Sequence, residues 1–241
     1  MKIIKWPLIY FLFQFILIFL LSYYYVSNGN DVNLFNDYLS TKQIYIALIV
    51  AIIFIPLLTN DYKKYKKQTN TKINYFYLTI LGVILSLMYN VFAYYLNFAL
   101  KTSLFDNNSN VAITLLSTGI LGPIIEELMF RGIIYNELKS KYSNMKSILI
   151  TTIFFAIIHI NIIQILYALI IGFILIFVYE KYNNIKAPII LHMASNITTT
   201  LFLPLLIKNN LIINYGIFIF SLILLIMLKK YTKLLKIWYN I

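Results

Sequence analysis

Long apolar runs alternate with short polar stretches along the whole chain. A transmembrane helix needs about 20 mostly apolar residues at 1.5 Å rise each. The pattern predicts eight such helices, over residues 7–26, 43–59, 74–100, 111–136, 147–160, 162–179, 185–207 and 211–228. The fifth and sixth share so little sequence that one of them should be short or strongly tilted. We therefore expect an all-α, polytopic integral membrane protein with about eight transmembrane helices.

Lysines are concentrated between alternate apolar runs. If both termini are cytoplasmic, the inside segments hold 16 of the 19 lysines, and only Lys42, Lys101 and Lys208 fall outside. The positive-inside rule counts basic residues in short loops such as these. We therefore expect a multi-pass protein of the cell membrane with both termini in the cytoplasm.

Composition supports this picture and excludes several classes of protein. Of the 241 residues, 61% are hydrophobic and 12% are charged, about half the charged fraction of a soluble domain. The net charge of +12 then fits attraction to anionic lipid rather than to nucleic acid. The absence of cysteine excludes thiolate catalysis and disulfide scaffolds. No repeat or linker divides the sequence, so residues 1–241 are expected to form one helical membrane domain.

A few ionisable residues lie inside the apolar runs, where charge is costly and marks function by default. The fourth run contains Glu126, Glu127 and Arg131, the only arginine of the chain, and both histidines, His159 and His192, also lie in runs. Glu127 and Arg131 are spaced i, i+4 and should face one another on a helix. Such a pair cancels the burial cost of its partners, which favours a structural role over a catalytic one.

Glu126 has no partner at helical spacing. A lone carboxylate in low dielectric suits a general base, or it is held protonated by a hydrogen bond to a neighbouring helix. His159 is either a satisfied core residue or a catalyst. His192 and Asn196 share a helix face at i, i+4, and two donors side by side resemble an oxyanion hole. Counted from the cytoplasmic helix ends, Glu126, His159 and His192 lie at overlapping depths, so they could meet in one cavity.

Together these segments resemble the CAAX protease and bacteriocin-processing (CPBP, or Abi) family of intramembrane proteases. The family shows Glu-Glu-x-x-x-Arg, Phe-x-x-x-His and His-x-x-x-Asn on successive helices. The counterparts here are Glu126 to Arg131, Phe155 to His159, and His192 to Asn196. All three motifs occur in order, and they define a catalytic core over residues 110–200.

The resemblance implies an endopeptidase in which Glu126 and His159 activate a water and His192 and Asn196 stabilise the oxyanion. Glu127 and Arg131 would support the site. If a metal took part, Glu126, His159 and His192 would form a zinc set with an open position for water. No His-Glu-x-x-His motif occurs, and a metal-free mechanism without cofactor is favoured.

The expected substrate is a peptide or protein at the membrane. Heavy use of Ile, Lys, Asn and Tyr is typical of an AT-rich bacterial genome, which favours maturation of secreted peptides, or immunity, over prenyl-tail trimming. Two alternatives stay open. One is a non-catalytic bacteriocin self-immunity or scaffold protein on the same fold. The other is a proton-coupled transporter, which the lack of internal repeats disfavours. The sequence carries no signal for an oligomeric state.

Overall fold

The computed structural model is entirely helical. It describes residues 2–66, 71–100, 110–159, 161–208 and 211–231. These residues form eight continuous helices, which confirms the all-α prediction. Seven of them are α1 (Lys2–Ser27), α2 (Phe35–Tyr62), α3 (Tyr75–Leu100), α7 (Asn144–Ile157), α8 (Ile162–Tyr182), α9 (Lys186–Lys208) and α10 (Leu211–Tyr231). A short 3-10 turn, η1 (Val32–Leu34), precedes α2.

The remaining helix is built from five consecutive pieces. These are α4 (Val111–Thr114), η2 (Leu115–Leu121), α5 (Gly122–Glu127), η3 (Leu128–Tyr135) and α6 (Asn136–Lys139). The pieces η2 and η3 are π-helical, and they flank the short α-helical piece that carries Glu126 and Glu127. Wide π turns inside helices occur frequently at functional sites, because they change the direction of the following side chains.

Five segments of the described chain are long and apolar enough to cross a membrane, so the protein is polytopic. They are Ile3–Ser27, Val32–Tyr62, Tyr75–Leu96, Val111–Lys139 and Ile162–Tyr182. Two shorter apolar stretches also occur among the described residues, Asn144–Ile157 of α7 and Asn214–Ile226 of α10. Helix α7 has 14 residues, about 21 Å of length.

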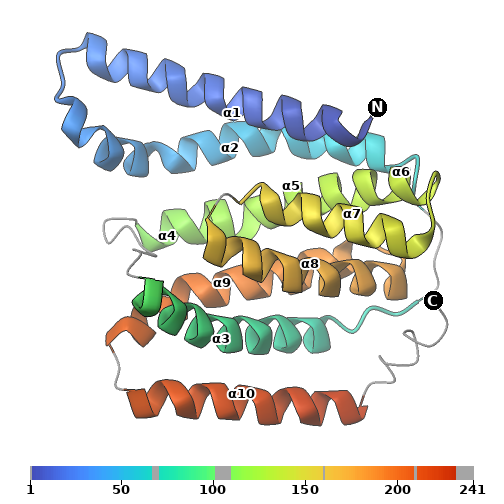
Figure 1. The fold of residues 1–241 in the computed structure, drawn as a ribbon. Coiled ribbons are helices and arrows are strands. Elements are labelled where there is room, and N and C mark those ends of the chain that lie inside the picture. Colours follow the sequence, from blue (N-terminus) through green and yellow to red (C-terminus); the bar gives the residue numbers. More distant parts are fainter. Residues whose placement is uncertain (1, 67–70, 101–109, 160, 209–210, 232–241) are drawn as a thin grey trace.

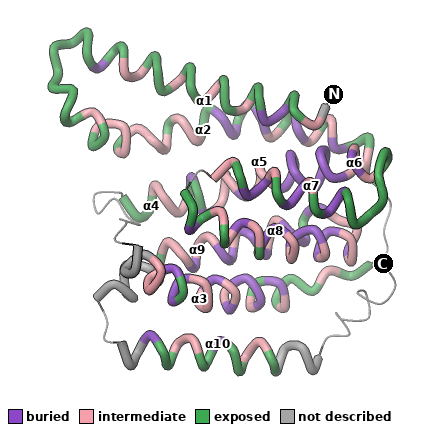
Figure 2. Tube along the Cα trace, viewed as in Figure 1, coloured by how far each residue is buried: buried purple, intermediate pink, exposed green. Residues whose placement is uncertain are grey.

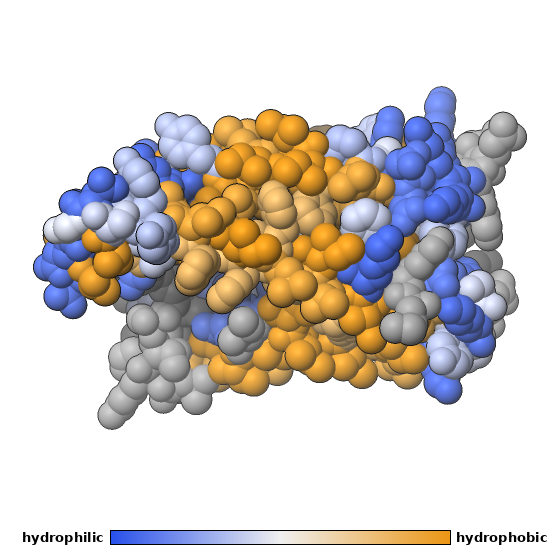
Figure 3. Space-filling view, turned by 90° about the horizontal axis from the view of Figure 1, so that it is seen from above, coloured by the Kyte–Doolittle hydropathy of each residue, from blue (hydrophilic) through white to orange (hydrophobic). Residues whose placement is uncertain are grey.

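The helices run antiparallel to one another, and their ends gather at two opposite faces. The start of α1, the end of α2 and the α6–α7 turn lie at one face, and the turn between α1 and α2 lies at the other (Figure 1). Seen from above, an apolar belt separates two hydrophilic ends (Figure 3). This distribution is the one expected of a protein that spans a bilayer.

The buried core lies between the inner helices. Helices α5 to α9 carry most of the buried positions, whereas α1 and α10 lie at opposite edges (Figure 2). Only 11% of the apolar segment of α1 is buried inside the protein, whereas 44% of the apolar segment of α8 is buried. The site residues therefore sit on the helices that other helices surround.

Helix α9 is held close to α3 by a glycine. A Cβ atom on Gly82 would lie 2.5 Å from the carbonyl oxygen of Leu191 and 3.0 Å from Cβ of Ala194. A backbone atom cannot move aside cheaply, so only glycine allows this approach. Small residues permit such close helix packing in membranes, and here they fix the part of α9 that carries His192.

The chain reverses direction sooner after α7 than the sequence predicts. The fifth apolar run, 147–160, places His159 inside a helix, but α7 ends at Ile157 and His159 lies in the turn that follows. The side chain of Asn161 accepts a hydrogen bond from the backbone N–H of Ile163 (2.9 Å) and caps α8. An N-cap of this kind begins a new helix, and it places the chain reversal immediately after His159.

Candidate active site

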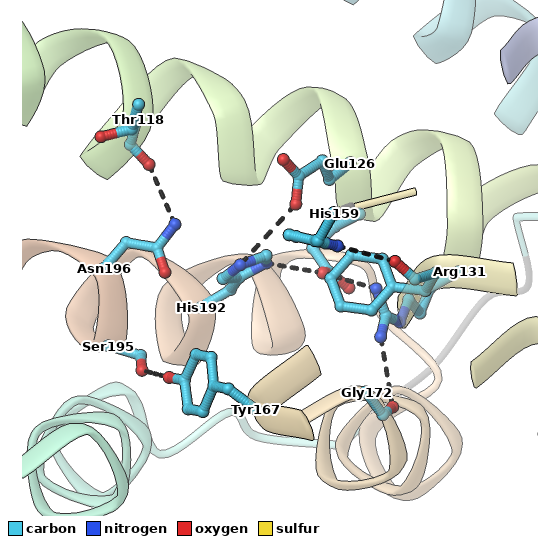
Figure 4. Close-up of polar contacts among 11 residues, drawn as sticks. Thr118, Glu126, Arg131, His159, Tyr167, Gly172, His192, Ser195 and Asn196 are labelled. Atoms are coloured by element: carbon cyan, nitrogen blue, oxygen red, sulfur yellow. Dashed lines mark hydrogen bonds and ion pairs between the residues drawn. The ribbon is translucent and has the colours of Figure 1, made fainter. Parts of the chain in front are cut away.

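At the centre of the site lies the fully buried carboxylate of Glu127, which binds two other side chains. Oε1 of Glu127 accepts hydrogen bonds from Nη1 of Arg131 (2.9 Å) and from Nδ1 of His192 (2.8 Å) (Figure 4). The side chains of Glu127 and Arg131 are 0% exposed. Because an ionised carboxylate only accepts hydrogen bonds, the Nδ1 atom of His192 must carry the hydrogen.

Arg131 is held in place by helix α8, which is distant from it in sequence. Its Nη2 atom donates to the carbonyl oxygen of Gly172 on α8 (3.2 Å), and its guanidinium lies over the ring of Phe155, 4.2 Å from the centroid. A Cβ atom on Gly172 would lie 3.3 Å from the Phe155 ring and 3.6 Å from Nη2 of Arg131. The planar guanidinium thus uses its fork of donors and its flat face together.

The second carboxylate of the motif faces the other side of the same imidazole. Oε2 of Glu126 lies 3.8 Å from Nε2 of His192, too far for a direct hydrogen bond. The side chain of Glu126 is 24% exposed, whereas that of His192 is 4% exposed. Since Nδ1 of His192 is bound to Glu127, Nε2 is the ring nitrogen that faces Glu126. Buried Glu127 orients the imidazole, and half-buried Glu126 remains accessible.

His159 has the same tautomer for a similar reason. Its Nδ1 atom lies 2.8 Å from the backbone carbonyl oxygen of Phe155, which accepts only, so Nδ1 donates and Nε2 is free to accept. The ring of Phe155 packs edge-on against both imidazoles, with centroids 5.0 Å from His159 and 6.0 Å from His192. Phe155 therefore contacts both histidines and the guanidinium of Arg131.

Asn196 is anchored to the opposite helix. Its Nδ2 atom donates to the carbonyl oxygen of Thr118 in η2 (3.0 Å). The amide has a second hydrogen on the same nitrogen, so one donor remains for a ligand. The adjacent Ser195 turns away from this group and hydrogen-bonds to the hydroxyl of Tyr167 on α8. Figure 4 shows Asn196 and His192 on one face of α9 and Ser195 on another.

The donor set does not form a metal site in this conformation. Among the described residues, no three His, Asp or Glu side chains lie close enough to hold one ion. Glu126 approaches His192, whereas Nδ1 of His159 is bound to the backbone carbonyl of Phe155. The set Glu126, His159 and His192 thus does not fit a zinc ion as it stands.

Several members of the site could not be assigned from the sequence. The hydrogen bond between His192 and Glu127 joins residues 65 positions apart, and the carbonyl of Gly172 shows no side-chain signal at all. A usable signal was present in α8, where Gly172 is the one glycine in a run of large apolar residues. Phe155 also stands in the Phe-x-x-x-His motif, but its packing against Arg131 required the structure.

A family model and a curated protein each match part of this chain. A family model described as type II CAAX prenyl endopeptidase Rce1-like matches residues 108–198, the segment that holds all six site residues. A protein of Bacillus subtilis (strain 168), named "Putative membrane peptidase YdiL", is 30% identical over 115 residues, which cover 48% of this chain and 47% of the relative. The chain thus spans about half the length of this curated relative. No solved structure matches the chain.

These matches confirm the resemblance that the three motifs indicated, over nearly the same residues. Residues 108–198 of the chain are thus similar to the Rce1-like type II CAAX prenyl endopeptidase family.

Proposed function

We propose that this protein is an intramembrane endopeptidase that hydrolyses a peptide bond with a water activated by Glu126. One observation carries the proposal: the half-buried carboxylate of Glu126 faces Nε2 of His192 across 3.8 Å, inside a helix bundle with a membrane-spanning apolar belt. A water beside the carboxylate of Glu126 can donate a hydrogen bond to it. A carboxylate near a water in low dielectric is a suitable general base.

We propose that His159 supports the same step. With Nδ1 bound to the carbonyl of Phe155, its free Nε2 accepts a hydrogen bond from the attacking water or takes a proton from it. Glu126 and His159 do not contact each other directly, so the water and the substrate carbonyl would lie between them. The proton that Glu126 accepts is then available for the leaving amine.

His192 and Asn196 are the proposed oxyanion donors. His192 donates from Nε2 in its imidazolium form, which carries a hydrogen on both nitrogens before the reaction begins, and the carboxylate of Glu127 on Nδ1 stabilises that cation. Asn196 uses the amide hydrogen that Thr118 leaves free. Donors placed where negative charge develops lower the barrier of acyl transfer. Glu127 and Arg131 act through His192 and are positioning residues.

The proposed substrate is a peptide that is anchored in the membrane or reaches it from the cytoplasmic side, for example a secreted-peptide precursor. We propose that all eight helices cross the cell membrane of a bacterium and that both termini are cytoplasmic. This topology is supported by the antiparallel arrangement, in which the start of α1 and the end of α10 lie at the same face (Figure 1). Labelling of a tag in the loop 101–110 from outside the cell tests it.

Glu126→Gln tests the proposed reaction, because it keeps the shape of the side chain and removes the base. The purified protein is incubated with a peptide library in detergent, and cleavage is mapped by mass spectrometry. Glu180→Gln is a matched control, since the Glu180 side chain is 25% exposed, like that of Glu126, but lies outside the site. We expect cleavage by the wild type and by Glu180→Gln and a loss of at least about 100-fold in Glu126→Gln. Undiminished cleavage by folded Glu126→Gln would refute the mechanism.

Removal of metal tests the chemistry of the water-activating step. Because the described donors do not converge on one ion, we expect turnover to be unchanged after incubation with a strong chelator. Loss of turnover that added zinc restores would show that Glu126, His159 and His192 rearrange into a metal site.

A further inference from the structure

The structure contains a cavity that lies outside the peptidase site. It has a volume of about 410 Å³ and lies between α1 and α2, toward the turn that joins them. The cavity is open on its outer side, where Leu20 and Tyr24 are exposed. Neither helix contributes a residue to the family domain at 108–198, so the cavity is separate from the site described above.

The wall of the cavity changes from apolar to polar along its length. Its deep part is lined by Leu17 and Leu21 of α1 and by Ile46 and Ile49 of α2. Its outer part, toward the turn between the helices, is lined by Tyr24, Tyr38 and Lys42. The separation between Leu17 and Tyr24 along α1 is about 10 Å at 1.5 Å per residue. A ligand that fills this space therefore has an apolar tail and a polar head.

The polar part carries the positive charge of Lys42. The Nζ atom of Lys42 lies over the rings of Tyr38 and Tyr45, 5.4 and 5.7 Å from their centroids. The ion pairs of the described residues do not include Lys42. Lys42 is also one of only three lysines outside the segments where the others are concentrated. A cation held over tyrosine rings is complementary to a phosphate group.

We propose that this cavity binds one anionic phospholipid, with an acyl chain between α1 and α2 and its phosphate at Lys42. The weak embedding of α1 in the protein supports this occupant. Only 11% of the apolar segment of α1 is buried inside the protein. On this side of the helix, Leu20 and Tyr24 are 55% and 62% exposed. A lipid here would fill the space between the two helices and join them.

Native mass spectrometry of the intact protein tests the proposal. The protein is released from detergent with equimolar phosphatidylglycerol and phosphatidylcholine of identical acyl chains. Lys42→Gln removes the charge at the head, and Ile49→Trp fills the apolar part from a position that is 42% exposed and tolerates a larger side chain. Lys146→Gln is the matched control, because Lys146 also lies over a tyrosine ring, Tyr142, at 4.8 Å, but far from the cavity.

We expect the wild type and Lys146→Gln to retain one phosphatidylglycerol in preference to phosphatidylcholine. Lys42→Gln should reduce that preference about fivefold, the effect of one basic residue at an anionic surface, and Ile49→Trp should abolish retention of both lipids. Equal retention of the two lipids by the wild type, or unchanged retention in either cavity variant, would overturn the proposal. A lipid-free dimer that Ile49→Trp dissociates would also overturn it and assign the cavity to a second copy of the chain.

Discussion

Nδ1 of His192 donates to Oε1 of Glu127 over 2.8 Å, and this bond joins α9 to the helix that carries the paired glutamates. The same oxygen accepts from Arg131. The two adjacent glutamates thus have different environments: Glu127 is fully buried and carries the hydrogen-bond network, whereas Glu126 is partly exposed and faces the free nitrogen of the imidazole.

The two isosteric changes at these glutamates should therefore have different effects. Glu127→Gln leaves the Arg131 cation buried without a counter-charge, and breaking a buried pair in this way costs about 3–5 kcal/mol. We expect Glu127→Gln to lower the yield of folded protein and its apparent melting temperature in detergent. Glu126→Gln should leave both near the wild-type values. Equal thermal stability of the two variants would contradict the assignment of Glu127 as the structural member.

Arg131→Lys tests whether the site needs a guanidinium rather than any positive charge. Lysine can reach Glu127, but its compact ammonium cannot also donate to the carbonyl of Gly172 or stack on Phe155. We expect a loss of about 2–3 kcal/mol of stability, in the range of a buried hydrogen bond from a charged group, seen as a reduced folded yield by size-exclusion chromatography. Lys139→Arg, at the partly exposed pair with Glu180, is the control and should have little effect. A normal yield of Arg131→Lys would show that charge alone suffices.

Much of the fold followed from local patterns in the sequence. Apolar runs located all eight helices of the described chain, because the length of a bilayer-spanning helix is set by the membrane. The i, i+4 spacing predicted that Glu127 and Arg131 face each other, and the structure has them 2.9 Å apart. The assigned roles of Glu126, His159, His192 and Asn196 remain predictions.

The interactions that the sequence could not predict are those that join distant helices. Spacing cannot show that His192 meets Glu127, nor that Asn196 donates to the backbone of Thr118. The π turns on either side of α5 depart from the 3.6-residue period on which the pattern depends. His159 lies in the turn after α7 because Asn161 caps the start of α8. The apolar run continues to residue 160, so its pattern alone did not show where α7 ends.

Gly82→Ala should displace α9, because its Cβ would lie 2.5 Å from the carbonyl oxygen of Leu191, the residue before His192. We expect a loss of about 1–3 kcal/mol of stability, as for overpacked cores, together with a loss of activity. Gly216→Ala is the control, since a Cβ there meets no atom within 4 Å. Thermal melts and cleavage assays on the two variants measure the effect. If Gly82→Ala melts and cleaves like the wild type, the close approach of α3 to α9 is not needed to position His192.

Tyr65 gives the protein a pH dependence at its polar end, outside the apolar spans. Its hydroxyl donates to Oε2 of Glu137 (2.6 Å) and ties the segment after α2 to α6. Burial and then the hydrogen bond and charge of Glu137 raise the pKa of Tyr65 from its ordinary 10.0 to about 12. A folded-state pKa above the unfolded value means that this stabilisation is complete below pH 10 and is lost as the pH rises toward 12.

We therefore expect the apparent melting temperature of the wild type in detergent to fall between pH 10 and 12 by more than that of Tyr65→Phe, which lacks the titrating hydroxyl. Below pH 10, Tyr65→Phe should be less stable than the wild type by about 1 kcal/mol, because it loses one hydrogen bond. Tyr142→Phe, at an exposed tyrosine on the same end of the bundle, is the control and should follow the wild type. Parallel curves for the wild type and Tyr65→Phe across this range would show that the contact with Glu137 does not couple protonation to folding.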